Sequence, residues 1–146
     1  MMPSGLLLTE LQICPTFGGR VMHAIRTDSP GFCGFGEAYF SNISAGITRG
    51  WKRHNDMTLN LIVPVGNIRF VLYCDNDTFS AGGGFYDVTI GQSNYVRLTV
   101  PPGIWVAFRG EGPNESMLMN LADILYSEEE SDRIDLNAIQ FDWGHK

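Results

Sequence analysis

A cluster of basic side chains lies near the middle of the chain. Arg49, Lys52, Arg53 and His54 follow one another closely, although the protein as a whole has a formal net charge of -6. Clustered cations bind phosphates, whereas nucleic acids need an extended basic face that an acidic chain does not offer. The cluster therefore indicates a small anionic ligand and no nucleic-acid partner. A solvated basic turn, or a structural pair of Arg49 with a carboxylate such as Glu37, is the alternative.

Lys52 and His54 are the members of this cluster that could transfer protons. A lysine with its ordinary pKa of ~10.4 is protonated at neutral pH, although burial among cations lowers such a pKa toward that of a base. An imidazole titrates near ~6.5 and is the better general base. If this stretch is a strand, both side chains share one face. The alternatives are a Lys52 paired with a phosphate or Asp56, and a His54 that only packs in a barrel.

The rest of the sequence predicts short strands separated by turns. Runs rich in β-branched and aromatic residues predict strands at 59–65, 68–74, 86–90, 96–100, 104–109 and 116–121. Residues 65–68 are expected to form a tight hairpin, and residues 127–132 and 135–139 short helical or turn segments. Trp51, Trp105 and Trp143 are expected in core or dimer packing. This pattern indicates one all-β domain over residues 1–146, a sandwich, jelly roll or barrel.

The spacing around the basic cluster resembles the first motif of the cupins, which are small β-barrels. In a frame that begins at Gly46 and ends at Gly66, Lys52 and His54 stand at the two histidine positions and Leu59 stands at the glutamate position. Glycines persist in such a frame because they set turns. The resemblance implies a cupin-type β-barrel or jelly roll of short antiparallel strands.

The metal ligands of cupins are largely missing from this chain. A second cupin motif, Pro-x-Gly-x-x-His, is matched by residues 101–103, but Val106 stands at the histidine position. A divalent metal needs several imidazole or carboxylate donors at ~2.0–2.2 Å. Lys52 would repel the ion, and Leu59 and Val106 offer no lone pair. We therefore expect a barrel without metal and without another cofactor.

Longer segments resemble the dTDP-4-dehydrorhamnose 3,5-epimerase family, the metal-free sugar-nucleotide cupins. Residues 46–52 resemble the family's Gly-x-x-Arg-Gly-x-His, and residues 139–143 resemble its closing Ile-x-Trp. Residues 36–40, 69–75 and 100–103 extend the resemblance. It implies a nucleotide-sugar ligand, a homodimer built through edge strands, and proton transfer at carbons next to a keto group.

The resemblance also implies roles for particular residues. Arg49 matches the arginine that contacts the nucleotide diphosphate, and Arg53 could assist it. The catalytic histidine and tyrosine of the family fall on Lys52 and Met119, and the aspartate that orients the histidine falls near Asp135. The catalytic candidates are therefore Lys52, His54 and Asp135.

The acid that returns a proton has no clear position in the sequence. Tyr73 and Tyr126 lie nearest the lost tyrosine, whereas Tyr39, Tyr86 and Tyr95 are expected to pack or to lie at edges. A phenol can donate only from within hydrogen-bond reach, which sequence does not define.

Two functions of different classes follow. The leading hypothesis is an epimerase or ketoisomerase that acts without metal on a dTDP-4-keto-6-deoxyhexose, in deoxysugar or surface-polysaccharide biosynthesis. The rival is a non-catalytic cupin that binds a nucleotide sugar or carbohydrate, and a metal cupin such as a dioxygenase is disfavoured.

No apolar run approaches the ~20 residues of a membrane helix, and residues 1–8 do not resemble a signal peptide. Three widely spaced cysteines fit reduced thiols, so we expect a cytoplasmic protein.

Overall fold

The computed structural model describes residues 5–75 and 84–144 of the chain. Within them the protein is built from strands, together with two 3₁₀ turns, η1 (Glu128–Glu130) and η2 (Leu136–Ala138). The strands are β1 (Leu7–Glu10), β2 (Ile13–Thr16), β3 (Gly19–Met22), β4 (Glu37–Ile43), β5 (Thr48–His54), β6 (Leu59–Val65), β7 (Asn67–Cys74), β8 (Gly84–Gly91), β9 (Val96–Val100), β10 (Trp105–Glu111), β11 (Ser116–Ala122) and β12 (Ser131–Arg133). The all-β class expected from the sequence is confirmed. No helix among the described residues has the length and apolar character needed to cross a membrane.

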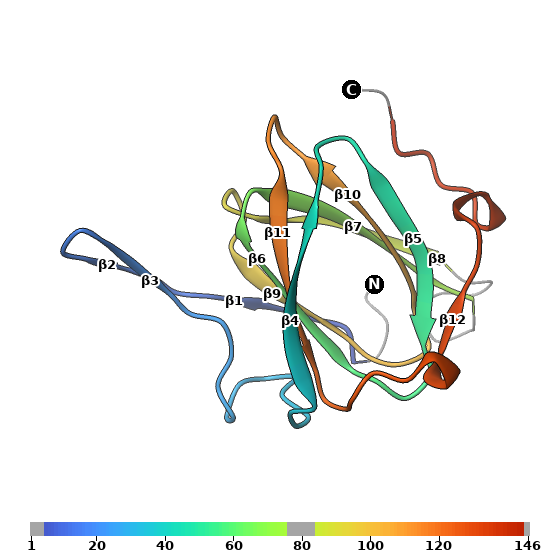
Figure 1. The fold of residues 1–146 in the computed structure, drawn as a ribbon, viewed down its shortest axis with the longest axis horizontal. Coiled ribbons are helices and arrows are strands. Elements are labelled where there is room, and N and C mark those ends of the chain that lie inside the picture. Colours follow the sequence, from blue (N-terminus) through green and yellow to red (C-terminus); the bar gives the residue numbers. More distant parts are fainter. Residues whose placement is uncertain (1–4, 76–83, 145–146) are drawn as a thin grey trace.

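Two five-stranded antiparallel sheets face each other (Figure 1). The strand order is β1-β9-β6-β11-β4 in the first sheet and β12-β5-β10-β7-β8 in the second. Residues 65–68 do not form the expected hairpin, because β6 and β7 belong to different sheets. Gly66, with φ of +79°, instead makes the turn that carries the chain from one sheet to the other.

The main core lies between the two sheets. Ile68, Phe70 and Leu72 are fully buried there, and they alternate along β7 with residues that face the other side of the sheet. Alternate residues of β6 meet them from the first sheet. This alternation fixes which side chains of each strand can reach the interior.

The C-terminal segment covers the outer face of the second sheet. Trp51 of β5 is 1% exposed and packs on this face with Trp105. Its indole nitrogen donates hydrogen bonds to the carbonyl oxygens of Leu136 and Ile139, at 3.0 and 3.2 Å. Both tryptophans are thus in packing positions, as expected.

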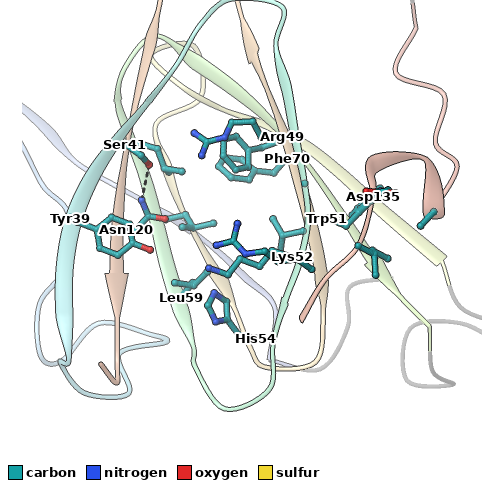
Figure 2. Close-up of a pocket in the computed structure, with 18 residues that line it drawn as sticks. Tyr39, Ser41, Arg49, Trp51, Lys52, His54, Leu59, Phe70, Asn120 and Asp135 are labelled. Atoms are coloured by element: carbon teal, nitrogen blue, oxygen red, sulfur yellow. Dashed lines mark hydrogen bonds between the residues drawn. The ribbon is translucent and has the colours of Figure 1, made fainter. Parts of the chain in front are cut away.

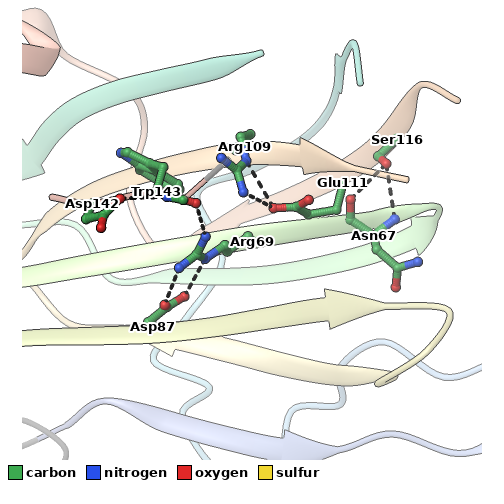
Figure 3. Close-up of polar contacts among 9 residues, drawn as sticks. Asn67, Arg69, Asp87, Arg109, Glu111, Ser116, Asp142 and Trp143 are labelled. Atoms are coloured by element: carbon green, nitrogen blue, oxygen red, sulfur yellow. Dashed lines mark hydrogen bonds and ion pairs between the residues drawn. The ribbon is translucent and has the colours of Figure 1, made fainter. Parts of the chain in front are cut away.

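Two arginines of the same sheet face hold the end of this segment (Figure 3). Arg69 donates to the carbonyl oxygen of Trp143 at 2.7 Å and is paired with Asp87. The guanidinium of Arg109, which is paired with Glu111, lies 5.4 Å from the centre of the Trp143 ring. The segment is therefore fixed on the sheet, and its first residues can form part of a site.

A hairpin of β2 and β3 projects from the two large sheets (Figure 1). Its apolar side chains Ile13, Phe17 and Val21 are exposed, and Phe17 has no cover at all. Two-stranded hairpins are marginally stable when isolated. Because these three side chains are exposed, the hairpin presents an apolar surface that is open to another molecule.

The bounds of the predicted strands agree with the structure to within two residues. The segment at 127–132 combines the 3₁₀ turn η1 with part of a strand, β12, that the sequence did not indicate. Residues 1–4, on which part of the signal-peptide interpretation rests, lie outside the described residues.

Candidate active site

A cavity of about 890 Å³ lies between the two large sheets (Figure 2). One wall is β5, which contributes Arg49, Lys52 and His54, and the opposite wall is formed by β4 and β11. Apolar core side chains also line the cavity, as do the first residues of the C-terminal segment. Four of the five candidate binding and catalytic residues therefore line one cavity, namely Arg49, Lys52, His54 and Asp135.

A β-bulge in β5 brings Arg49 to this cavity. Arg49 and Lys52 are three residues apart, yet they pair with β10 positions that are two residues apart. Gly50 and Trp51 together oppose the single residue Ala107. Gly50 has a φ of +148°, and a Cβ at this position would lie 2.5 Å from the Cβ of Ala107. Without the bulge, strict alternation would turn Arg49 to the outer face.

The guanidinium of Arg49 is exposed at the cavity. Its central carbon lies 5.8 Å from the centre of the Phe108 ring, and no ion pair found among the described residues involves it. Glu37, the carboxylate considered as its structural partner, accepts a hydrogen bond from the backbone nitrogen of Tyr126 at 3.1 Å. Arg49 is therefore placed to meet an anionic ligand.

His54 forms a buried pair with Glu130. The imidazole Nδ1 is hydrogen-bonded to the carboxylate Oε1. The second oxygen, Oε2, accepts hydrogen bonds from the backbone nitrogens of Asn55, Asp56 and Met57, at 3.2, 3.0 and 3.1 Å. The ring is therefore held on its Nδ1 side, and Nε2 has no hydrogen-bond partner within the described part of the chain.

The Glu130 carboxylate stays ionised in this setting. Burial alone would raise its pKa, but the hydrogen bonds from His54 and from the backbone of Asp56 and Met57 outweigh burial and hold the pKa below its usual value. An ionised carboxylate only accepts hydrogen bonds, so Nδ1 carries the proton. The Nε2 lone pair of a neutral ring is then available to act as a base.

Lys52 lies beside a second cation, Arg133. The two residues are directly paired in the β5–β12 ladder. Burial and the charge of Arg133 lower the pKa of Lys52, and Glu130 partly opposes them. The Nζ atom of Lys52 lies 4.9 Å from the centre of the Tyr126 ring. Two adjacent cations at one cavity are a further reason to expect an anionic ligand.

The wall opposite β5 consists of paired residues from two strands. Tyr39 and Ser41 of β4 pair with Asn120 and Leu118 of β11, and all four line the cavity. The Asn120 amide donates to the Ser41 hydroxyl at 3.1 Å. Met119, to which the family's tyrosine was assigned, stands between two inward-facing residues of β11 and does not line the cavity.

Arg53 lies on the outer face of β5. Its guanidinium pairs with Asp132 at 3.0 Å and with Asp75 at 3.6 Å, and it stacks 4.5 Å from the centre of the Trp105 ring. It faces outward because it stands between two inward-facing residues. The structure therefore does not bring Arg53 to the cavity, contrary to the expected assisting role.

Asp135 reaches the cavity at the start of η2. The Nδ1 atom of His54 is bonded to Glu130 and not to Asp135. Of the tyrosines considered as acids, Tyr73 packs in the outer cluster and Tyr126 stacks on Lys52. Neither of these two tyrosines lines the cavity.

The donor set at the cavity does not fit a cupin metal centre. Lys52, Leu59 and Val106, which replace the usual ligands, all line the cavity, and only His54 offers an imidazole. A cation and two hydrocarbons cannot coordinate a divalent ion. Within residues 5–75 and 84–144, no group of three or more His, Cys, Asp or Glu side chains is arranged to hold a metal.

Solved structures of sugar-nucleotide enzymes share this fold. The dTDP-4-dehydrorhamnose 3,5-epimerase from Elizabethkingia anophelis NUHP1 has a TM-score of 0.80 and 15% identity, over 100% of this chain and 85% of that chain. A dTDP sugar isomerase from Desulfovibrio desulfuricans G20 has a TM-score of 0.89 and 39% identity, over 97% of this chain and 92% of that chain. This chain belongs to the dTDP-4-dehydrorhamnose 3,5-epimerase-like family.

A further relative of this chain comes from Haloferax volcanii. The probable low-salt glycan biosynthesis epimerase Agl13 of Haloferax volcanii is 27% identical over 112 residues, which are 73% of this chain and 72% of that protein. No protein-family model matches the chain. The family and the cupin-type fold inferred from the sequence are thus confirmed.

Sequence reasoning missed several residues of this epimerase-like site. Glu130 stands in an acidic run in which Glu128 and Glu129 are exposed, so the run itself does not single out the buried member. Arg133 becomes visible only through the pairing of β12 with β5. For Tyr39 the sequence predicts packing or an edge position, and no local pattern shows that it enters a cavity.

Proposed function

We propose that this protein is a sugar-nucleotide epimerase or ketoisomerase that acts on a dTDP-4-keto-6-deoxyhexose, in deoxysugar or surface-polysaccharide biosynthesis. The observation that carries the proposal is the His54–Glu130 pair, which presents an imidazole at a cavity that also holds Arg49. The similarity to a dTDP sugar isomerase supports the nucleotide, and the similarity to a glycan biosynthesis epimerase supports the pathway class.

His54 is the proposed base. Its Nε2 atom removes a proton from the ring carbon next to the ketone, and the C–H electron pair becomes the C=C bond of an enolate. Glu130 keeps the proton on Nδ1 and stabilises the imidazolium that forms. A carboxylate-oriented imidazole is the arrangement that this step requires.

Lys52 is the proposed partner of the enolate oxygen. A cation beside a developing negative charge lowers the barrier of proton abstraction, and the effect is larger where water is excluded. Lys52 is partly buried at the cavity, and this burial and the charge of Arg133 lower its pKa. The nearby Arg133 keeps the local potential positive, so the negative enolate is favoured.

Arg49 is the proposed anchor of the diphosphate. A guanidinium offers paired donors that match phosphate oxygens, and charge-assisted bonds of this type are strong. The side chain is exposed at the cavity, and its described surroundings give it no carboxylate partner. The diphosphate would then bind at Arg49 while the sugar lies toward His54.

The proposal includes a cytoplasmic homodimer. Exposed apolar side chains on the β2–β3 hairpin, together with the open edge of β4, are surfaces that a second copy could cover. Edge strands left open invite aggregation, so pairing them is a common solution.

Product analysis combined with a binding titration tests the proposed function. The purified protein is incubated with dTDP-4-keto-6-deoxyglucose, the products are resolved by NMR, and dTDP affinity is measured by calorimetry for wild type and His54→Asn. We expect an isomerised sugar only with wild type, and dTDP binding by both. Binding without turnover by wild type would support the non-catalytic alternative, and the absence of both would refute each function.

A further inference from the structure

Epimerisation needs a proton donor on the face of the sugar opposite the base. The β5 wall carries His54 and Lys52, so a donor on the other face must come from β4 or β11. Among the described cavity residues of those strands, Leu118 has no exchangeable proton, and Asn120 is neither an acid nor a base at any ordinary pH. Tyr39 and Ser41 are the remaining candidates.

The hydroxyl of Ser41 is a poor donor for this step. An alkyl hydroxyl is a far weaker acid than a phenol, whose pKa is ~10. Tyr39 is thus the one titratable side chain on this wall among the residues that the structure describes.

Tyr39 is directed into the cavity. Figure 2 shows its ring beside Asn120, with the hydroxyl toward the wall that carries Lys52 and His54. The direct pairing of Tyr39 with Asn120 fixes where the ring leaves the strand. The hydroxyl and the imidazole therefore approach the same space from opposite walls.

The surroundings of Tyr39 keep the phenol protonated. Burial raises its pKa above the ordinary value, the charges of Glu37 and Tyr126 raise it further, and Arg133 opposes them. At neutral pH the hydroxyl is therefore a hydrogen-bond donor that has a proton to give.

We infer that Tyr39 is the catalytic acid that protonates the enolate from the face opposite His54, which rests on the function proposed above. The enolate electron pair forms a new C–H bond with the phenolic proton, and the ketone C=O bond is restored. The phenolate that remains takes a proton from water, and the imidazolium of His54 releases its proton to water. The sugar carbon ends with inverted configuration and a solvent-derived hydrogen.

This assignment favours epimerisation over ketoisomerisation as the outcome at the site. A base alone would return the proton from its own face, so the carbon would exchange hydrogen without inversion. An acid on the opposite wall makes inversion possible.

The test compares Tyr39→Phe, Tyr126→Phe and Tyr73→Phe with wild type in D₂O. Each protein receives dTDP-4-keto-6-deoxyglucose, and NMR follows both deuterium at the carbons next to the ketone and the amount of inverted sugar. Because general acids contribute ~10²–10⁴-fold, we expect Tyr39→Phe to invert the sugar about 100-fold more slowly or worse. Its deuterium exchange should stay within about 10-fold of wild type, since His54 is intact.

Tyr73→Phe serves as the matched control, because Tyr73 packs outside the cavity, and it should behave as wild type. Calorimetry with dTDP checks that each variant is folded. Inversion by Tyr39→Phe at the wild-type rate, or a loss confined to Tyr126→Phe, would overturn the inference and leave the proposed function intact. Absence of both exchange and inversion in wild type would overturn the proposed function, and the inference with it.

Discussion

His54 and Glu130 are separated by 76 residues in the chain, and the imidazole Nδ1 of the first is hydrogen-bonded to the carboxylate Oε1 of the second. The contact exists because β12 pairs with β5, with Ser131 opposite His54. The adjoining 3₁₀ turn then places the Glu130 carboxylate beside the Nδ1 atom of the ring. The imidazole and its carboxylate partner are therefore held together by one strand pairing.

Replacement of Glu130 by Gln tests this pair. A neutral amide cannot fix the proton on Nδ1 or stabilise the imidazolium, so kcat should fall by about 100-fold while KM changes little. Loss of a buried charged acceptor should also lower the free energy of unfolding by about 1–3 kcal/mol at pH 7. Steady-state kinetics and denaturant unfolding measure the two effects, and Glu128→Gln, in the same turn but exposed, is the control.

The effect of Glu130→Gln on stability should depend on pH. The pKa of Glu130 is lower in the folded protein than the ~4.3 of an unfolded chain. The ionised carboxylate therefore contributes fully to the free energy of unfolding at pH values above the unfolded pKa. This contribution is lost as the pH falls through the pKa of the folded protein. The stability gap between wild type and Glu130→Gln should narrow from pH 6 to pH 3. A gap that does not change with pH would show that the carboxylate charge plays no part.

Replacement of Arg49 tests the diphosphate site. We expect Arg49→Ala to lose about 1.5–3 kcal/mol of dTDP binding free energy and Arg49→Lys to lose a smaller part, with little change in Tm. Arg53→Ala is a matched control, because Arg53 is paired with carboxylates outside the cavity. It should lower Tm and leave dTDP affinity unchanged. Normal dTDP binding by folded Arg49→Ala would show that Arg49 does not bind the diphosphate.

Replacement of Gly50 tests the bulge. Alanine there combines an unfavourable φ with a clash against Ala107, so Gly50→Ala should cost about 1–3 kcal/mol of stability and weaken dTDP binding by displacing Arg49. Gly46→Ala is the control, since Gly46 also has a positive φ but has open space around its Cβ position. Thermal melts and calorimetry compare them, and equal effects of the two would argue against a special role of the bulge.

Sedimentation tests the proposed homodimer. Wild type should sediment as a dimer at micromolar concentration, because the apolar hairpin otherwise stays exposed. Phe17→Asp should shift the protein toward monomer without lowering its folding stability, since Phe17 makes no buried contacts in the single chain. A monomeric wild type would contradict the proposal.

Sequence reasoning succeeded where the pattern is local. Strands such as β6 and β9 are rich in aliphatic and β-branched residues and lie between turn residues, so the sequence predicts their bounds. Alternation was enough to place Lys52 and His54 on one face. The same alternation places Arg53 on the opposite face, as observed, but it fails for Arg49, because a bulge shifts the phase of β5 in the middle of the strand.

The remaining parts of the site depend on long-range pairing. Glu130 and Arg133 reach the cavity only because β12 joins the edge of the second sheet, and a strand of three residues leaves no periodic signal. Tyr39 lies on an edge strand, as expected, but its inward face is set by the register with β11. Residue type alone does not encode these placements.

The central claim is that His54 removes a proton next to a sugar ketone without metal. Its most direct test is NMR of dTDP-4-keto-6-deoxyglucose in D₂O with a metal chelator present, for wild type and His54→Asn. Wild type should replace the hydrogens next to the ketone with deuterium, and His54→Asn should do so about 100-fold more slowly while it still binds dTDP. No exchange by wild type that binds dTDP, or equal exchange by His54→Asn, would contradict the account.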